Sequence, residues 1–211
     1  MSERHVAQPA NIYRLKDCAD AQILYQGWAA TYDHDLLDRM AWKGHRAVAE
    51  MMANCSIPLD AAILDIGCGT GLCGQALYEK GFVKIVGLDL TRAMLMLAAI
   101  KSVSQSLLMA DATKQLPLGD ACFDVVCSAG LFSHGPVLPQ HIELMLRPLK
   151  LNGIAIHTIN GLAFDKLDYD RTLSRLTSDG VIEIISIQTI EYTVNADVPG
   201  KMVVLRHNKR A

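Results

Sequence analysis

Apolar and polar positions along this chain predict strands and helices in alternation. Short apolar runs bounded by turn residues are typical of buried parallel strands, and the segments between them carry apolar residues at helical spacing. The expected strands are 62–66, 83–88, 107–110, 123–128, 154–159, 181–194 and 201–207. The connection between the last two is too short for a crossover helix, so this pair is predicted to be antiparallel. We therefore predict an α/β fold: a doubly wound, mostly parallel seven-stranded sheet with an antiparallel last strand pair.

Helices are predicted both before the first strand and between the strands. The first two, 17–37 and 42–54, form an N-terminal helical cap. The expected helices of the core are 72–80, 91–101, 139–149 and 162–178. The sequence contains no internal repeat or linker. Residues 1–211 are therefore expected to form a single domain, with the cap at 1–57 and the cofactor-binding core at 58–211.

Composition excludes several classes of partner. The chain has 211 residues, of which 51% are hydrophobic, and a formal net charge of −2 with both signs interspersed. It lacks the basic stripe that nucleic-acid binding requires and the polybasic run expected at a membrane surface. Met1–Ala10 lacks the apolar core of a signal peptide, and no apolar run is long enough to cross a bilayer. We expect a cytoplasmic protein with a small-molecule partner; its oligomeric state is left open.

Six cysteines raise the question of a metal or disulfide site. Cys68 and Cys73 are five residues apart, as are Cys122 and Cys127. Cys122 and Cys127 flank a predicted strand, where an odd separation directs two side chains to opposite faces. We therefore expect six reduced, mostly buried thiols and no metal site.

A glycine-rich turn follows the first predicted strand and leads into a helix. Gly67, Gly69 and Gly71 alternate with small residues, which lets backbone N–H groups approach a ligand beside the positive end of the helix. Gly69–Gly74 satisfies the G-x-G-x-x-G pattern, and Asp89 lies 20 residues beyond Gly69. A dinucleotide-binding fingerprint has the same spacing, so the glycines alone do not decide between nucleotides.

Four neighbouring features favour S-adenosylmethionine. Asp65, before the first glycine, would repel a pyrophosphate and attract an ammonium group. Asp89 closes the second strand, where it can accept both ribose hydroxyls, and Asp111 closes the third, where an adenine edge would lie. The antiparallel last pair is the fourth feature, because a dehydrogenase would be expected to continue with further βα units. A nicotinamide-dependent oxidoreductase remains an alternative, as does a binding protein without catalysis.

These segments resemble a known family. Leu64–Gly71 is similar to motif I of the class I S-adenosylmethionine-dependent methyltransferases, and Asp89–Leu95, Asp111–Asp120 and Phe123–Val126 resemble the successive motifs of the methyltransferase-11/25 type. More narrowly, 25–33 and 128–135 resemble the methyltransferase-like 27 group. The usual Leu-Lys-Pro-Gly-Gly turn before the fifth strand is Leu149–Gly153 here, with the proline and first glycine replaced.

The resemblance implies S-adenosylmethionine as cofactor and assigns roles to residues of these motifs. Asp65 would orient the amino group, Asp89 would bind the ribose, and Asp111 would meet the adenine with Ala112. Tyr32 would close over the cofactor, although Tyr32 and Trp28 can equally be the apolar face of a cap helix. The predicted cofactor-binding residues are Tyr32, Asp65, Gly67, Cys68, Gly69, Gly71, Asp89, Leu90, Met94, Asp111, Ala112 and Ser128.

One histidine is the best candidate for a general base. His134 follows the fourth strand, at the edge where open α/β proteins hold their ligands, although it can instead tie down the Gly135-Pro136 loop. His34, His157 and Asn160 are lesser candidates. A base is not required of every acceptor, because alignment supplies about 7 to 11 kcal/mol and a carboxylate or thiolate is already deprotonated. Methyl transfer to an O, N or S atom of a small molecule is the predicted reaction.

Overall fold

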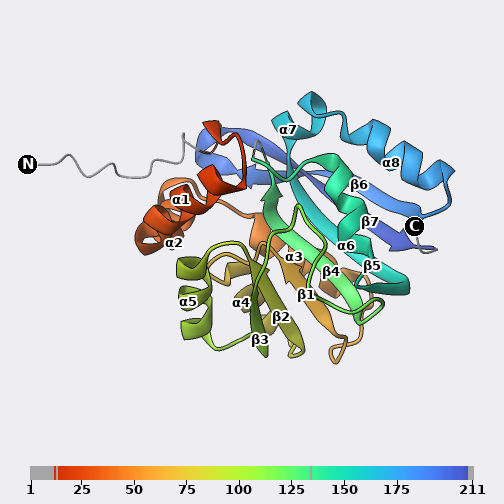
Figure 1. Cartoon of the computed structure of the whole chain (residues 1–211), viewed down its shortest axis with the longest axis horizontal. Coiled ribbons are helices and arrows are strands. Elements are labelled where there is room, and N and C mark those ends of the chain that lie inside the picture. The colour runs from red at the N-terminus through yellow and green to blue at the C-terminus, as the bar shows by residue number, and fades with distance from the viewer. Residues whose placement is uncertain (1–11, 13, 134, 209–211) are drawn as a thin grey trace, which may run out of the picture.

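One mixed sheet runs through the molecule in the order β3-β2-β1-β4-β5-β7-β6 (Figure 1). The structure is a computed structural model and describes residues 12, 14–133 and 135–208. Within these residues the strands are β1 Ile63–Ile66, β2 Ile85–Asp89, β3 Ser106–Met109, β4 Phe123–Phe132, β5 Leu149–Asn160, β6 Ile182–Thr193 and β7 Val198–His207. β1 to β5 are parallel, and β7 is antiparallel to both β5 and β6. The predicted doubly wound sheet with an antiparallel last pair is confirmed.

Helices cover both faces of the sheet (Figure 1). The core helices are α3 Gly44–Asn54, α4 Leu72–Glu79, α5 Arg92–Lys101, α6 Ile142–Leu146, α7 Gly161–Lys166 and α8 Tyr169–Ser178, with short 3₁₀ turns at Pro139–His141 and Val194–Ala196. Side chains of α3 and α4 pack with Ile63 and Val125 on one face, whereas those of α6 and α8 pack with Leu64 and Val126 on the other. The alternation of strand side chains thus divides the core into two apolar layers.

The cap precedes the sheet and lies beside α5 (Figure 1). It consists of α1 Cys18–Trp28, a 3₁₀ turn at Ala29–Thr31, α2 Tyr32–His34 and a π-helical turn at Asp35–Arg39. The side chain of Asp17 caps α1 by accepting hydrogen bonds from Ala19 N and Asp20 N. Because α1 ends at Trp28 and a 3₁₀ turn follows it, the single predicted helix 17–37 is broken after Trp28. In the described residues, no helix combines the length and apolar character required to cross a bilayer.

Two further predictions of local structure are wrong for tertiary reasons. The predicted helix 162–178 is two helices, separated where Asp168 takes a φ of +55°. This break lets the ring of Tyr169 stack on that of Phe164, with centroids 5.5 Å apart. The predicted turn at Asn152-Gly153 lies inside β5, where Asn152 has a φ of +62° and the pairing of β4 with β5 shifts register.

Candidate active site

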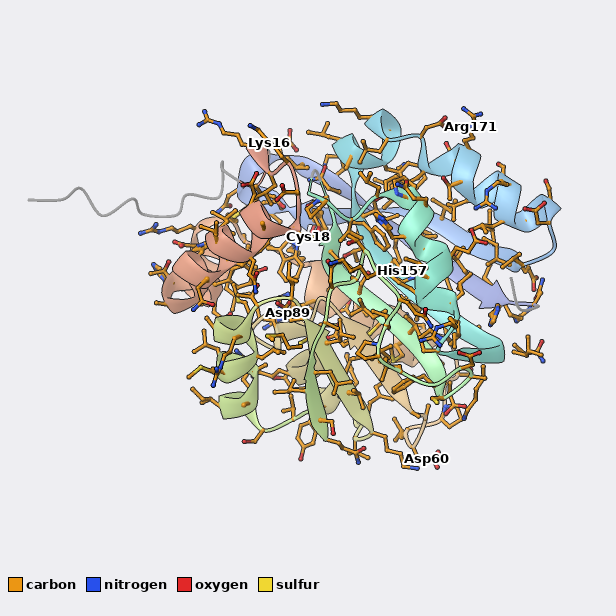
Figure 2. The ribbon with its side chains drawn as sticks, viewed as in Figure 1. Lys16, Cys18, Asp60, Asp89, His157 and Arg171 are labelled. Carbon is orange, nitrogen blue, oxygen red and sulfur yellow. The ribbon has the colours of Figure 1, made fainter. Side chains whose placement is uncertain are left out.

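The carboxyl ends of β1, β2 and β4 meet at one edge of the sheet, and the cap lies against that edge. Between them is a cavity of about 760 Å³, solvent at its mouth included, which we call the edge cavity. Predicted residues that line it are Tyr32, Gly67, Gly69, Asp89, Leu90, Met94, Asp111 and Ala112. Figure 2 labels Cys18 of the cap and Asp89 of β2, and both residues line the edge cavity.

The glycine turn uses its backbone donors inside the protein. Gly67 N and Cys68 N both donate to Leu88 O, at 2.7 and 2.9 Å, and Gly71 N donates to Cys68 O at 2.8 Å. Gly69 N donates to Asp89 Oδ2 at 2.9 Å. The expectation that N–H groups of this turn are directed at a ligand is therefore wrong for these four groups. Because a pyrophosphate would lack these four donors, the turn fits a dinucleotide poorly.

Two of these glycines are required by geometry. Gly67 has a φ of +72°, and a Cβ there would lie 2.7 Å from Leu131 Cδ1. Gly71 has a φ of +87°, and its Cβ would approach Ala98 of α5 to 3.2 Å. Gly71 does not line the edge cavity. It instead lets α4 begin close against α5.

Asp89 holds the wall of the edge cavity together. Its Oδ1 accepts a hydrogen bond from Thr91 N at 2.8 Å, and its Oδ2 accepts the bond from Gly69 N. Burial raises the pKa of this carboxyl, although both backbone N–H groups favour its charged form. Each oxygen can accept a further bond, so a ribose hydroxyl can be recognised without breaking the existing pair.

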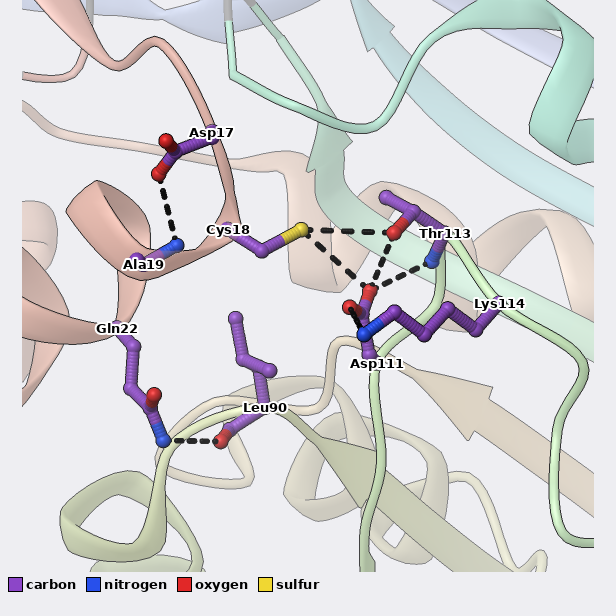
Figure 3. A network of polar contacts seen from close by, with 8 residues as sticks. All are labelled: Asp17, Cys18, Ala19, Gln22, Leu90, Asp111, Thr113 and Lys114. Atoms are coloured by element: carbon purple, nitrogen blue, oxygen red, sulfur yellow. Dashed lines mark hydrogen bonds and ion pairs between the residues drawn. The ribbon is translucent and has the colours of Figure 1, made fainter.

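Asp111 connects the core to the cap (Figure 3). Its Oδ1 accepts hydrogen bonds from Thr113 N at 2.8 Å, Thr113 Oγ1 at 2.6 Å and Cys18 Sγ at 3.4 Å, and Lys114 lies 3.5 Å from Oδ2. Burial alone would raise the pKa of Asp111, but these partners hold it below its ordinary value. Gln22 Nε2 adds a second tie by donating to Leu90 O at 3.4 Å. The adenine end of the predicted site is thus closed by the first turns of α1.

Asp65 lies behind the glycine turn, on the α4 side of the sheet, and does not line the edge cavity. Cys127 Sγ donates to its Oδ1 at 3.9 Å, and its Oδ2 is buried without a partner among the described residues. Burial raises the pKa of Asp65 to about 7, with a further contribution from the charge of Asp89. The ligand atoms of Asp65, Cys73 and Cys127 lie within 4.8 Å of one another, a grouping that sequence spacing did not reveal.

Two other predicted residues point away from the cavity. Cys68 is buried, and its Sγ packs where a Cβ on Gly87 would lie, 2.9 Å away. Ser128 is fully buried, and its Oγ lies 2.8 Å from His157 Nδ1. Their cofactor-binding roles stay predictions. Cys122 is exposed and Cys127 buried, as expected for the two ends of an odd spacing on a strand.

The candidate bases are spread over the molecule. His134 lies outside the described residues, so its role stays a prediction. His157 belongs to β5 (Figure 2), and burial lowers its pKa to about 4. His34 is exposed beside Asp38, with 2.7 Å between Nδ1 and Oδ2. Asn160 Oδ1 caps α7 by accepting from Leu162 N at 3.0 Å and Ala163 N at 3.2 Å.

The cap contributes more of the wall than the sequence indicated. Leu15, Cys18, Ala21 and Tyr25 all line the edge cavity. The one available signal was helical spacing, because Tyr25 lies on the same apolar stripe as Trp28 and Tyr32. Trp28 is buried and donates from Nε1 to Asp35 Oδ2 at 2.7 Å, which confirms its place in the apolar face of the cap. The ring centroids of Trp28 and Tyr32 are 4.7 Å apart.

Three residues fasten the cap to the glycine turn, a contact we call the Asp33 latch. Lys101 Nζ donates to Asp33 Oδ2 at 2.7 Å and to Thr70 O at 2.8 Å. Thr70 Oγ1 donates to Asp33 Oδ1. α2, the glycine turn and α5 therefore share one polar contact, which sequence spacing did not predict.

Comparison with known proteins identifies the class. Residues 64–157 match the family model described as "Methyltransferase domain". Methyltransferase-like protein 27 of Homo sapiens is 30% identical over 176 residues, which are 80% of this chain and 71% of that protein. The 18S rRNA (guanine-N(7))-methyltransferase RID2 of Arabidopsis thaliana is 36% identical over 85 residues, which are 36% of this chain and 29% of that protein.

A solved methyltransferase structure has a similar fold. Magnesium protoporphyrin IX methyltransferase from Synechocystis, solved with bound S-adenosylmethionine, superposes with a TM-score of 0.69 at 16% identity, covering 92% of this chain and 98% of that one. The chain belongs to the S-adenosylmethionine-dependent methyltransferases, in the family of methyltransferase-like protein 27. The predicted family and enzyme class are confirmed, and the oxidoreductase alternative is wrong.

Proposed function

We propose that this enzyme transfers the methyl group of S-adenosylmethionine to an O, N or S atom of a small molecule. The observation that carries the proposal is the edge cavity itself. It joins a wall of strand-end residues, Gly67, Gly69, Asp89 and Asp111, to a wall made by the cap. A cofactor bound along the strand ends would therefore be covered on its other side by aromatic rings of the cap.

The residues present fit this cofactor. Gly67 and Gly69 line the cavity and carry no side chain, which lets the methionine part approach the backbone at these two positions. Asp89 keeps acceptor capacity for ribose hydroxyls, and Met94 with Leu90 supplies an apolar surface for the nucleoside. The carboxyl of Asp65, buried and partly unpartnered behind the turn, adds negative potential that favours an ammonium group once it is ionised, above its pKa of about 7.

The chemistry divides between cofactor and protein. When bound, the cofactor supplies a sulfonium methyl carbon that bonds to the acceptor atom while the electron pair of the broken C–S bond stays on sulfur, giving S-adenosylhomocysteine. The protein's own residues bind, orient and exclude water. The cap, fastened by the Asp33 latch, keeps solvent from one side of the cavity, and alignment of this kind supplies most of the rate.

A small molecule is favoured over RNA as the acceptor by the charge of the wall. Neither Lys, Arg nor His occurs among the described residues that line the edge cavity. RNA binding depends on cationic contacts to phosphates, and the chain carries a net charge of −2. The relative that acts on 18S rRNA matches only 36% of this chain, so its substrate does not transfer readily. We also retain the cytoplasmic location expected from the sequence.

Thermal unfolding with three ligands tests the cofactor. S-adenosylmethionine or S-adenosylhomocysteine at about 100 times its dissociation constant should add ~2.7 kcal/mol to the free energy of unfolding, and NAD should add nothing. Incubation with a methyl-labelled donor, a fractionated metabolite pool and total RNA then tests the acceptor. Label in a small-molecule fraction supports the proposal. Label in RNA alone, or in no fraction, contradicts it, and the second result favours a binding protein without catalysis.

His134 is tested separately. His134→Ala should leave the affinity for S-adenosylhomocysteine unchanged, because the predicted role concerns the acceptor's proton. If the acceptor is a hydroxyl or ammonium group, turnover should fall by about 10²- to 10⁴-fold. Unchanged turnover would mean that His134 only holds the Gly135-Pro136 loop.

A further inference from the structure

A second cavity adjoins the edge cavity beneath the cap. It encloses about 530 Å³, solvent at its mouth included, and we call it the aromatic chamber. Its main lining residues are Tyr25, Tyr32, Met40, Trp42, Asn160 and Tyr192. Tyr25 and Tyr32 also line the edge cavity, as do Gly130 and Ser133. The two spaces therefore share a wall, and a molecule in the chamber lies next to a cofactor in the edge cavity.

The chamber is preformed by contacts between the cap and β6. Lys43 N donates to Tyr192 O at 2.9 Å, Asn195 N donates to Met40 O at 3.3 Å, and Asn195 Nδ2 donates to Arg39 O at 2.8 Å. Trp42 also forms a bridge with Thr193. These bonds join residues 39–43 to the end of the sheet, so the walls are positioned before any ligand binds.

Trp42 owes its position to two glycines. A Cβ on Gly44 would lie 2.6 Å from the Trp42 ring, and one on Gly130, which has a φ of +81°, would lie 3.1 Å from it. The ring stacks on His45, with centroids 5.0 Å apart, and meets Tyr192 edge-on at 6.0 Å. Trp42 is thus a fixed, flat part of the chamber wall.

The described lining of the chamber is mostly aromatic and aliphatic, with the polar residues Ser133, Asn160 and Thr193, and it is uncharged. None of the described lining residues is Lys, Arg, His, Asp or Glu. Burial raises the pKa values of Tyr25 and Tyr32 above their ordinary range, so both phenols stay protonated. Their hydroxyl groups can form hydrogen bonds but cannot balance a ligand's charge.

We propose that the aromatic chamber binds the methyl acceptor and selects a neutral molecule with an aromatic ring; this inference rests on the proposed function. A cationic acceptor would lie beside the sulfonium of the cofactor, and like charges in a low-dielectric site repel strongly. An anionic acceptor would lose its hydration without gaining a cationic partner. A flat neutral ring instead gains edge-on and stacked contacts with Trp42, Tyr25 and Tyr192.

Three probes with the same ring and different charge test this selection. The full chain, saturated with sinefungin, a non-transferring cofactor analogue whose amino group carries a positive charge where the sulfonium would lie, is titrated by calorimetry at pH 7 with 2-naphthol, 2-naphthoate and 2-naphthylmethylamine. We expect 2-naphthol to bind at least tenfold more tightly than either charged probe. Equal or tighter binding of the anion or the cation would overturn the inference.

Variants then assign the binding to the chamber. Met40→Trp should fill the space and weaken 2-naphthol at least tenfold, while Ile23→Trp, on an exposed face of α1, is the matched control and should change nothing. Trp42→Leu, which removes a wall instead of filling the space, should also weaken the probe, with folding checked by circular dichroism. Wild-type affinity for 2-naphthol in a folded Met40→Trp or Trp42→Leu protein would overturn the inference.

The experiment also separates the two proposals. If S-adenosylhomocysteine does not bind the wild-type chain, the proposed function fails at the edge cavity. If S-adenosylhomocysteine binds and the naphthyl probes show no preference for the neutral ring, the proposed function stands and the chamber's selectivity is refuted. Affinity for S-adenosylhomocysteine, measured without a probe, should be unchanged in Met40→Trp.

Discussion

The edge cavity and the aromatic chamber share a wall but are built in different ways. The strand-end side of the edge cavity consists of short segments that each follow a strand, with polar groups already paired inside the protein. The chamber consists mainly of single side chains from α1, α2, residues 35–42 before α3, β5 and β6, and its described lining is uncharged. The first arrangement suits a fixed, polar cofactor. In the second arrangement, substituting a few side chains can change which ligand binds without disturbing the sheet.

The largest expected effect concerns the carboxyl behind the glycine turn. Burial raises the pKa of Asp65 to about 7, so between pH 4 and 7 the folded protein binds more protons than the unfolded chain and loses stability as pH rises. Asp65→Asn removes the titratable carboxyl and therefore this pH-dependent loss of stability. Relative to the wild type, the variant's free energy of unfolding should rise by about 2 to 4 kcal/mol between pH 4 and pH 8, measured by urea denaturation. A difference independent of pH would mean that Asp65 titrates normally.

A smaller effect, on the affinity for the cofactor product, is expected from a change in the edge cavity alone. Asp89→Ala removes the acceptor of Gly69 N and Thr91 N and a partner for ribose. S-adenosylhomocysteine should bind about 1.5 to 3 kcal/mol more weakly by calorimetry. Asp60→Ala, at an exposed carboxylate that pairs with Lys84, is the control and should bind normally. Unchanged affinity in Asp89→Ala would remove this residue from the cofactor site.

The Asp33 latch should have a more modest influence. Lys101→Ala breaks both bonds from Lys101 Nζ, which loosens the cap over the edge cavity. We expect the affinity for S-adenosylhomocysteine to fall by about 1 kcal/mol or less, because the Lys101–Asp33 ion pair is partly exposed and such pairs contribute little. Lys84→Ala, at a more exposed ion pair, serves as the matched control. An equal effect of both variants would show that the latch does not act on the cavity.

The smallest effect is expected at the rim of the chamber. Glu191 pairs with Lys43 near the bonds that join the cap to β6, and both side chains are largely exposed. Exposed pairs contribute little, so Glu191→Ala should change 2-naphthol affinity by about twofold or less. A much larger loss would show that this ion pair, and not the backbone bonds of residues 39–43, holds the chamber closed.

The cofactor side was predictable because its chemistry follows the strands in sequence. Asp89, Leu90 and Met94 line the edge cavity as expected, and so do Asp111 and Ala112. Two other predicted residues have side chains that point away from the cavity, and their cofactor-binding roles stay predictions. Cys68 and Ser128 lie in the matched motifs, but their side chains pack inside the protein because a motif position does not specify which face a side chain takes.

The sequence by itself determined the fold and the residues at the strand ends, because apolar periodicity and turn chemistry act over a few neighbouring positions. The enzyme class came from the resemblance of its motifs to those of the methyltransferases. Only the tertiary structure decided that the N–H groups of the glycine turn form hydrogen bonds within the protein and that Asp65 faces two thiols. It also decided where the chamber lies. Tyr25 and Trp42 are far from Tyr192 in the sequence, and the three residues meet only after the cap docks on β6. No local sequence pattern therefore predicts their contact.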